Sequence, residues 1–340
     1  MVCRRSLAVR TGCAALIASA SLGVVSAAHA ATALMRRPYP IVAVAVDGDR
    51  VAVASYPQNC ARVDLTDVRA ARPVRLSRRS VLYCEGAFGG SRGAFLALAG
   101  SRAYWVFSLP GNFLYPELLT AAPGSFERQL VPPGIGDRTV GPFLGPVAAS
   151  GSTLAYSTYR IAQATDGTLS PPYDTTLTLG GHRVALPAPG GIVGSVDSGR
   201  AAVMLSDGRV AVVRARGPAL IVSTGLRSAR SVAIAGNRLV VLAGERLYAF
   251  DATTGRPHGS YPATGATHVD LWAGVAVLTT RHGVVALRVA NGHRRAIATV
   301  ARGRRLAGFA EVESGGIVWA TTPSGPGTSI VWRVALPTLR

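Results

Sequence analysis

The strongest constraint on the fold is a recurring unit: a short apolar strand, a tight turn containing glycine, and a second apolar strand. Its clearest copies cover residues 41–55, 95–108, 145–158, 192–205, 231–242, 269–279 and 309–320. Their pivot glycines are Gly48, Gly100, Gly151, Gly199, Gly236, Gly274 and Gly315. The spacing of roughly 37 to 52 residues indicates repeated supersecondary units. Glycine suits the pivot because a two-residue hairpin turn needs a positive φ.

These units predict an all-β fold, because their flanking runs alternate at period two or are wholly apolar, as in strands buried between stacked sheets. A second hairpin follows in the clearer copies, at 246–261 and 283–299, so each unit holds four strands. Seven units over 31–340 give about 44 residues each, the size of a propeller blade. We expect a single β-propeller of seven four-stranded blades. Six or eight blades, or a pair of β-sandwiches, are the alternatives.

The last unit holds only three clear strands and ends near Leu336. We expect the segment after Ala30 to supply the missing outer strand. Pairing between this N-terminal strand and the last unit would close the ring of blades and leave no open sheet edge.

Residues 1–30 have the pattern of a secretory signal peptide. Arg4, Arg5 and Arg10 precede a short apolar run, and Ala28-His29-Ala30 offers the small residues that signal peptidase needs. We expect cleavage after Ala30, with 31–340 as the mature propeller, no membrane span after cleavage, and a secreted, extracellular or wall-associated location. The arginine pair leaves Sec and twin-arginine export both open.

The mature chain keeps two cysteines, Cys60 and Cys84. An even number of cysteines in an exported protein points to a disulfide, since the outside compartment is oxidising. We expect these two to pair. The alternative is two buried thiols that never meet, because the sequence does not give the Cα spacing that a disulfide requires.

The basic charge is carried entirely by arginine. The formal charge of +19 falls to +16 when the three arginines of the signal are removed. The arginines are scattered, and the densest groups are Arg36-Arg37, Arg78-Arg79, Arg294-Arg295 and the trio Arg302, Arg304 and Arg305. None is the basic run typical of nucleic-acid binding, so we expect no specific nucleic-acid partner. Attraction to a polyanion stays open.

One repeat copy carries a recognisable motif. Residues 247–256 read LYAFDATTGR, and this run resembles the repeat of quinoprotein-like (PQQ-like) β-propellers. The match is partial at 284–293, where Arg288 replaces the aspartate. The motif is also similar to the WD40 and YVTN-like class. The resemblance implies a propeller fold and little about activity, because fold does not determine function.

No residue set predicts catalysis, a cofactor or a metal site. The chain offers no residues for the calcium and catalytic roles that a quinone cofactor would need in the resembled family. The five mature histidines lack zinc-site spacing. Asp47-Gly48-Asp49 resembles half a calcium loop, although its apolar flanks favour a hairpin turn. Glu311 and Glu313 could share one side of a strand, and a solvated face is the expected reason.

Three functions therefore stay open. The favoured one is a monomeric binding or scaffold module for a protein, polysaccharide or cell-wall partner. Long aromatic-bearing segments at 109–143 and 160–173 are candidate binding loops. The second is a propeller enzyme of lactonase, lyase or oxidoreductase type, which convergent carboxylates or histidines at one channel mouth would favour. The third is arginine-mediated polyanion binding, which arginines gathered on one face would favour.

Overall fold

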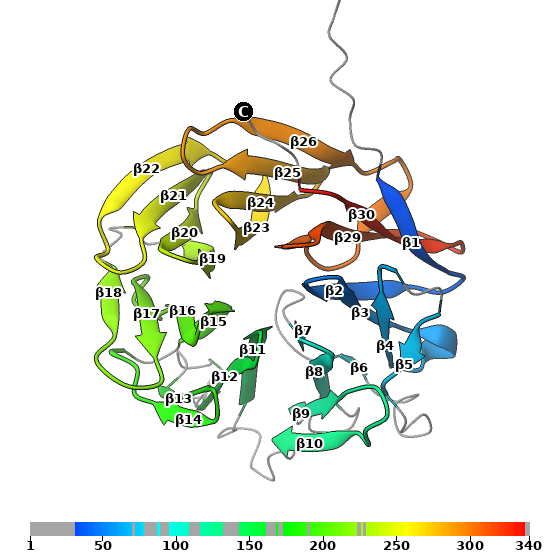
Figure 1. Ribbon diagram of the computed structural model, residues 1–340, viewed down its shortest axis with the longest axis horizontal. Coiled ribbons are helices and arrows are strands. Elements are labelled where there is room, and N and C mark those ends of the chain that lie inside the picture. Colours follow the sequence, from blue (N-terminus) through cyan, green and yellow to red (C-terminus); the bar gives the residue numbers. More distant parts are fainter. Residues whose placement is uncertain are drawn as a thin grey trace, which may run out of the picture.

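The computed structural model describes residues 31–69, 72–77, 87–88, 95–108, 116–131, 143–160, 168, 173–188, 191–222, 226 and 229–336. Seven antiparallel sheets stand radially around a common axis (Figure 1). The expected all-β fold and the seven blades are confirmed. The one helical element among the described residues is a single 3-10 turn, Pro57–Asn59.

The blades follow one another along the chain, and each runs from an inner strand at the axis to an outer strand at the rim. Blade 1 comprises β2 (Ile41–Asp47), β3 (Arg50–Ser55), β4 (Arg62–Asp67) and β5 (Val74–Arg75). Blade 2 comprises β6 (Ala87–Phe88), β7 (Leu96–Ala99), β8 (Arg102–Ser108), β9 (Pro116–Ala121) and β10 (Arg128–Val131). Blade 3 comprises β11 (Phe143–Ser150), β12 (Thr153–Arg160), β13 (Tyr173–Leu179) and β14 (His182–Val184).

Blade 4 comprises β15 (Ile192–Asp197), β16 (Arg200–Met204), β17 (Val210–Arg214) and β18 (Leu220–Val222). Blade 5 comprises β19 (Ala229–Ala235), β20 (Arg238–Ala243), β21 (Arg246–Asp251) and β22 (Pro257–Pro262). Blade 6 comprises β23 (Ala266–Trp272), β24 (Val275–Thr280), β25 (Gly283–Arg288) and β26 (Arg294–Thr299). Blade 7 comprises β27 (Arg304–Leu306), β28 (Glu311–Glu313), β29 (Gly316–Pro323), β30 (Ser329–Val334) and β1 (Thr32–Arg37).

The pivot glycines form the two-residue turns between the first and second strands of the blades. In blade 4, Asp197 pairs with Arg200, and both turn residues, Ser198 (φ 49°) and Gly199 (φ 74°), have the positive φ of a type I′ turn. All seven turns lie at the same end of the ring, because every inner strand runs in the same direction. We call this end the hairpin face. The opposite end, which carries the second-to-third-strand turns and the blade-to-blade connections, is the connection face.

The N-terminal strand closes the ring. β1 pairs with β30 as the outermost strand of blade 7, with Thr32 opposite Arg333 and Arg37 opposite Ser329. The expected strand exchange is therefore confirmed. An ion pair reinforces the seam between blades 7 and 1, since Asp64 of β4 binds Arg37 of β1 at 3.4 Å; Asp64 also binds Arg62 of its own strand at 2.9 Å.

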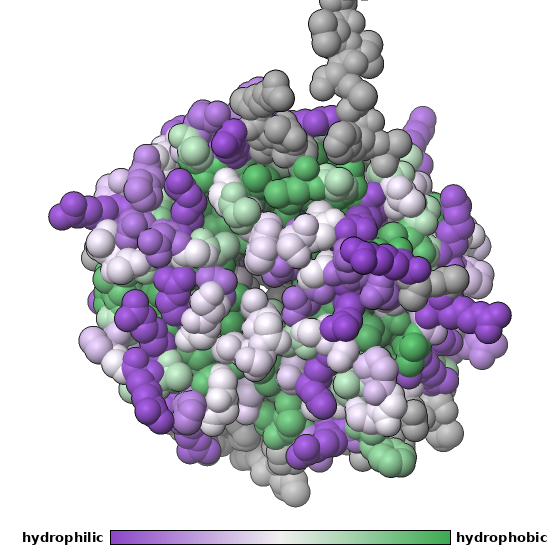
Figure 2. Space-filling model, viewed as in Figure 1, coloured by the Kyte–Doolittle hydropathy of each residue, from purple (hydrophilic) through white to green (hydrophobic). Residues whose placement is uncertain are grey.

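Apolar contacts between adjacent blades make up the core. Val212 of blade 4 packs in one buried cluster with Val241 of blade 5, and Val277 of blade 6 packs with Trp319 of blade 7. Burial of each such side chain stabilises the fold by about 1.5–3 kcal/mol. Hydrophilic side chains project around the rim of the disc (Figure 2). No helix within the described ranges has the length and apolar character to cross a bilayer.

The motif that resembles the quinoprotein-like repeat forms the turn between β21 and β22. Asp251 Oδ1 accepts hydrogen bonds from the amides of Thr253 (2.9 Å) and Thr254 (2.7 Å) and from the Thr254 hydroxyl (3.0 Å). In the partial copy, Asn291 Oδ1 accepts from the amide of His293 at 3.0 Å. The shared chemistry of the two copies is thus turn formation, and it implies no catalytic role.

Several expectations concern residues that the structure does not describe. Residues 1–30, with the predicted signal, lie outside the described ranges, and so does Cys84. The Cys60–Cys84 disulfide therefore stays a prediction. Of the candidate binding loops, residues 116–131 form β9, β10 and the turn between them in blade 2, whereas 109–115, 132–142 and most of 160–173 lie outside these ranges.

Candidate functional site

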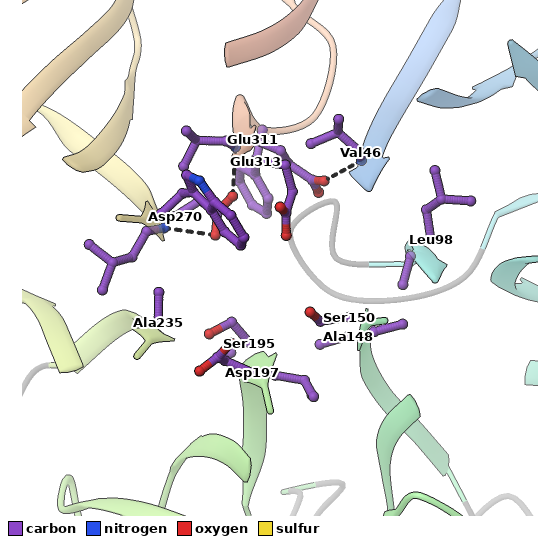
Figure 3. Close-up of a pocket in the computed structure, with 18 of the residues that line it drawn as sticks. Val46, Leu98, Ala148, Ser150, Ser195, Asp197, Ala235, Asp270, Glu311 and Glu313 are labelled. Atoms are coloured by element: carbon purple, nitrogen blue, oxygen red, sulfur yellow. Dashed lines mark hydrogen bonds between the residues drawn. The ribbon is translucent and has the colours of Figure 1, made fainter. Parts of the chain in front are cut away.

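The inner strands of the seven blades line a narrow channel along the ring axis, with a cavity of about 90 Å³. Figure 3 shows Asp270, Glu311 and Glu313 on one side of the channel, facing Ser195, Asp197 and Ser150 on the other. The carboxylates come from blades 4, 6 and 7. They converge because the inner strands are parallel to one another and meet at the axis.

A wider recess of about 530 Å³ opens at the hairpin face. Its polar and aromatic lining comes from the turns of blades 1, 3, 4, 6 and 7 and includes Asp47, Ser150, Ser152, Asp197, Trp272 and Glu313. This recess, which we call the channel mouth, falls within the volume range of small-ligand sites. The channel below it is too narrow for such ligands.

Three channel residues accept hydrogen bonds from the neighbouring blade. They occupy the same position in their own blades, two residues before the end of the inner strand. Ser195 Oγ accepts from the Ile234 amide at 2.7 Å. Asp270 Oδ2 accepts from the Val312 amide at 2.8 Å, and Glu311 Oε2 accepts from the Val46 amide at 2.9 Å. The other four blades carry alanine there: Ala45, Ala97, Ala148 and Ala233. These side chains therefore satisfy amides across the seams between blades.

The last residue of the inner strand makes a second kind of hydrogen bond between blades, to the amide of a pivot glycine. Asp47 Oδ2 accepts from the Gly100 amide at 2.5 Å, and Asp197 Oδ2 accepts from the Gly236 amide at 2.9 Å. Glu313 holds the same position in blade 7 but accepts from Ser314, in its own turn, at 3.1 Å. Within the described part of the chain, Glu313 is thus the mouth carboxylate that is not bound across a seam.

Burial changes the acidity of the channel carboxyls. It raises the pKa of Asp270 to about 6, against the opposing effect of the amides of Val312 and Leu271. It also raises the pKa of Glu311 well above its usual value, with a further contribution from the charge of Asp270. The pKa of Glu313 rises to about 7 through burial and then through the charges of nearby carboxylates. Part of this acidic group therefore keeps its protons near neutrality.

His268 also lies in the channel, although the sequence gives no sign of this position. Its ring stacks on Phe309 with centroids 3.9 Å apart, and Nδ1 lies 3.0 Å from the Ser231 hydroxyl. Burial lowers the pKa of His268 to about 3, so the ring is neutral. The expectation that Glu311 and Glu313 form a solvated face is likewise wrong, because both line the channel.

The arginines of the hairpin face compensate only some of these charges. Arg200 Nη2 binds both Asp197 (3.1 Å) and the carbonyl of Gly236 (2.6 Å). Among the described residues, Asp47, Asp270, Glu311 and Glu313 have no cationic partner. The mouth is thus an acidic recess in a strongly basic chain.

Metal binding has no support in this part of the chain. No three histidine, cysteine or acidic side chains within the described ranges are grouped so that they could hold a metal ion. Asp47-Gly48-Asp49 forms a hairpin turn, since Asp47 pairs with Arg50 in the ladder between β2 and β3.

The comparisons with known proteins find similarity of fold. The sequence matches no protein-family model and, at a significant level, no curated protein. A chain of a mitotic checkpoint complex superimposes with a TM-score of 0.57 at 13% identity, covering 98% of this chain and 99% of that one. The Pan2 WD40 domain of Neurospora crassa gives a TM-score of 0.53 at 9% identity, covering 92% and 98%.

These likenesses show the fold. The expected resemblance to the WD40-like propeller class is confirmed at that level, and no particular member is identified. The chain is a seven-bladed β-propeller.

Proposed function

We propose that this propeller is an exported binding module that recognises a protein partner at the channel mouth on the hairpin face. The observation that carries the proposal is the recess of about 530 Å³, lined by side chains from five blades. A site built on tight hairpins of a rigid ring is preorganised, which reduces the entropy lost on binding.

The charge of the mouth indicates which partner it fits. Asp47 and Glu313 accept hydrogen bonds only from backbone amides, so a cation can approach both carboxyl groups, and Glu313 carries its full negative charge above its pKa of about 7. Trp272 adds an aromatic side chain at the same recess, and a cation over an indole face is stabilised by about 0.5–2 kcal/mol. A lysine or arginine side chain of a partner segment matches both features.

The bonding of the carboxylates supports binding over catalysis. Asp270 and Glu311 are occupied in bridging the seams of blade 7, so their convergence has a structural reason. WD40-like propellers are scaffolds for many different interactions, and this chain shares their fold. Export, extracellular location and the monomeric state belong to the same proposal and rest on the signal pattern of residues 1–30.

A direct test uses hexalysine as a probe of the mouth. A fluorescent hexalysine peptide is titrated with the mature protein, and its anisotropy is followed. We expect Glu313→Gln and Trp272→Ala each to weaken binding at least fivefold. Asp207→Asn removes an exposed carboxylate of the connection face and should leave binding unchanged. Equal affinities in all four proteins would refute a cation site at the mouth.

One observation favours an enzyme as the second candidate. Glu313 has a pKa of about 7, opens to the mouth and is not bound across a seam, as a general acid–base would require. A lactone and ester panel tests this idea. Turnover that Glu313→Gln abolishes and Asp207→Asn retains would establish catalysis, and no turnover by the wild type would leave the binding proposal standing.

A further inference from the structure

Four arginines gather on the connection face, where blade 6 meets blade 7. Arg281 lies in the turn between β24 and β25, and Arg302 lies in the connection between β26 and β27. Arg304 and Arg305 begin β27. We call these four residues the arginine track. They lie at the opposite end of the ring from the acidic mouth.

Backbone hydrogen bonds hold the segments of the track together. The Val300 amide donates to the carbonyl of His282 at 2.8 Å, which joins the connection to the turn that carries Arg281. The Arg304 amide donates to Ala301 at 3.1 Å and closes a β-turn. Gly303, at its third position, has φ +78°, as a type II turn requires. Arg302 thus stands at the tip of an ordered turn.

Arg304 is anchored without losing its charge. Its Nε and Nη2 bind the Thr321 hydroxyl at 3.2 and 3.1 Å, and Nη2 also binds the carbonyls of Thr321 (3.0 Å) and Thr328 (2.9 Å). All of these acceptors are neutral. Since neighbouring residues of a strand point to opposite sides, Arg305 points away from these contacts, and it is exposed.

No carboxylate neutralises the track within the described part of the chain. Arg281, Arg302 and Arg305 are exposed and make no ion pair there. Elsewhere, arginines such as Arg62 and Arg209 do pair with aspartates. The track is therefore a concentration of uncompensated guanidinium groups on ordered backbone.

We propose that the arginine track binds a linear phosphate-bearing polymer. Guanidinium forks match phosphate oxygens, and several exposed arginines on one face of the ring suit charges repeated along a chain. The segments 281–282 and 300–305 contain no aromatic ring for base stacking other than the imidazole of His282, so recognition rests on phosphate. This surface is distinct from the proposed protein site at the mouth.

The test compares two double variants with the same loss of charge. Arg302→Gln/Arg305→Gln removes two track arginines. Arg294→Gln/Arg295→Gln removes two from the hairpin end of β26, in the same blade-6 region. Binding of inorganic polyphosphate is measured by calorimetry over a series of salt concentrations, and thermal unfolding confirms that each variant folds.

We expect the affinity of the track variant for polyphosphate to fall at least fivefold and that of the control less than twofold. Removal of each arginine–phosphate interaction should also reduce the slope of log affinity against log salt by about 0.7. Equal losses of affinity in both variants would show non-specific charge attraction and overturn the proposal. So would tighter binding of polyglutamate, or binding of anionic vesicles without binding of polyphosphate, because these outcomes point to a carboxylate polymer or a membrane surface.

Discussion

Replacement of Asp64 by asparagine should weaken the closure of the ring. Asp64 lies on β4 of blade 1, is completely buried, and binds Arg37 of β1 and Arg62 of its own strand. Arg37 belongs to the N-terminal strand that completes blade 7. The carboxylate therefore joins the two ends of the propeller, and an amide of the same size removes only its charge.

The magnitude follows from the burial of the three groups. Removing one partner of a buried ion pair costs about 3–5 kcal/mol. The side chains of Arg37 and Arg62 keep 19% and 27% exposure, so water partly solvates them after the change. We therefore expect about 3 kcal/mol, at the lower end of that range. An unfolding entropy of about 2.1 cal/mol/K per residue gives roughly 0.6 kcal/mol/K for this domain, and hence a Tm lower by about 5 °C.

Calorimetry and hydrogen exchange measure the two parts of this prediction. The Tm shift gives the global effect, and faster exchange of the β1 amides locates it at the seam. Asp207→Asn is the matched control, because the Asp207–Arg209 pair is exposed and such pairs contribute at most about 1 kcal/mol. A Tm shift below about 1 °C for Asp64→Asn, or unchanged exchange of β1, would refute the reasoning.

Three other changes test the channel, the seams and the predicted disulfide. The raised pKa of Glu313 means that the folded state holds a proton that the unfolded state releases, so stability falls as pH rises from about 4.5 through about 7. Glu313→Gln cannot titrate at this position, so its free energy of unfolding should rise relative to that of the wild type as pH rises through this window. Chemical denaturation at one pH below the window and one above it measures the difference, and a difference that does not change with pH would contradict the prediction. Gly194→Ala should lower Tm strongly, because a Cβ there would lie 2.2 Å from the Val232 carbonyl oxygen, whereas Gly325→Ala, in open space, should not; circular dichroism melts compare them. Thiol titration of the unfolded mature protein should find no free cysteine before reduction, and reduction should remove about 3 kcal/mol of stability, as expected for a loop of roughly 24 residues.

The architecture could be predicted from the sequence because it depends on local signals. Asp47-Gly48 and Ser198-Gly199 specify hairpins by their own chemistry, and the strands on either side are fixed by period-two and apolar runs. Spacing then gives the number of blades. The pairing of β1 with blade 7 could be predicted because the last unit in the sequence has only three clear strands, and a blade without its outer strand would expose an unpaired edge.

The candidate site could not be predicted in the same way. Asp47, Asp197 and Asp270 are far apart in the chain, and they meet only because their inner strands converge on one axis. His268 looks like a strand-end residue in the sequence, yet ring closure buries it against Phe309. A usable signal did exist: Asp47, Asp197 and Glu313 all end their inner strands, directly before the turn. Equivalent positions in successive blades face the same channel.

Charged side chains make different contacts on the two faces of the ring. On the hairpin face, seven inner strands converge, and carboxylates there satisfy amides of the neighbouring blade, as Asp47 and Asp197 do. Arginines of that face also bridge neighbouring blades, as Arg200 does when it donates a hydrogen bond to the carbonyl of Gly236. The arginines of the track bind no carboxylate in the described structure, and Arg304 is held by neutral oxygens alone. Contacts between blades therefore explain the charges at the seams, whereas no carboxylate in the described part of the chain pairs with the track, and an external anion is its simplest counterpart.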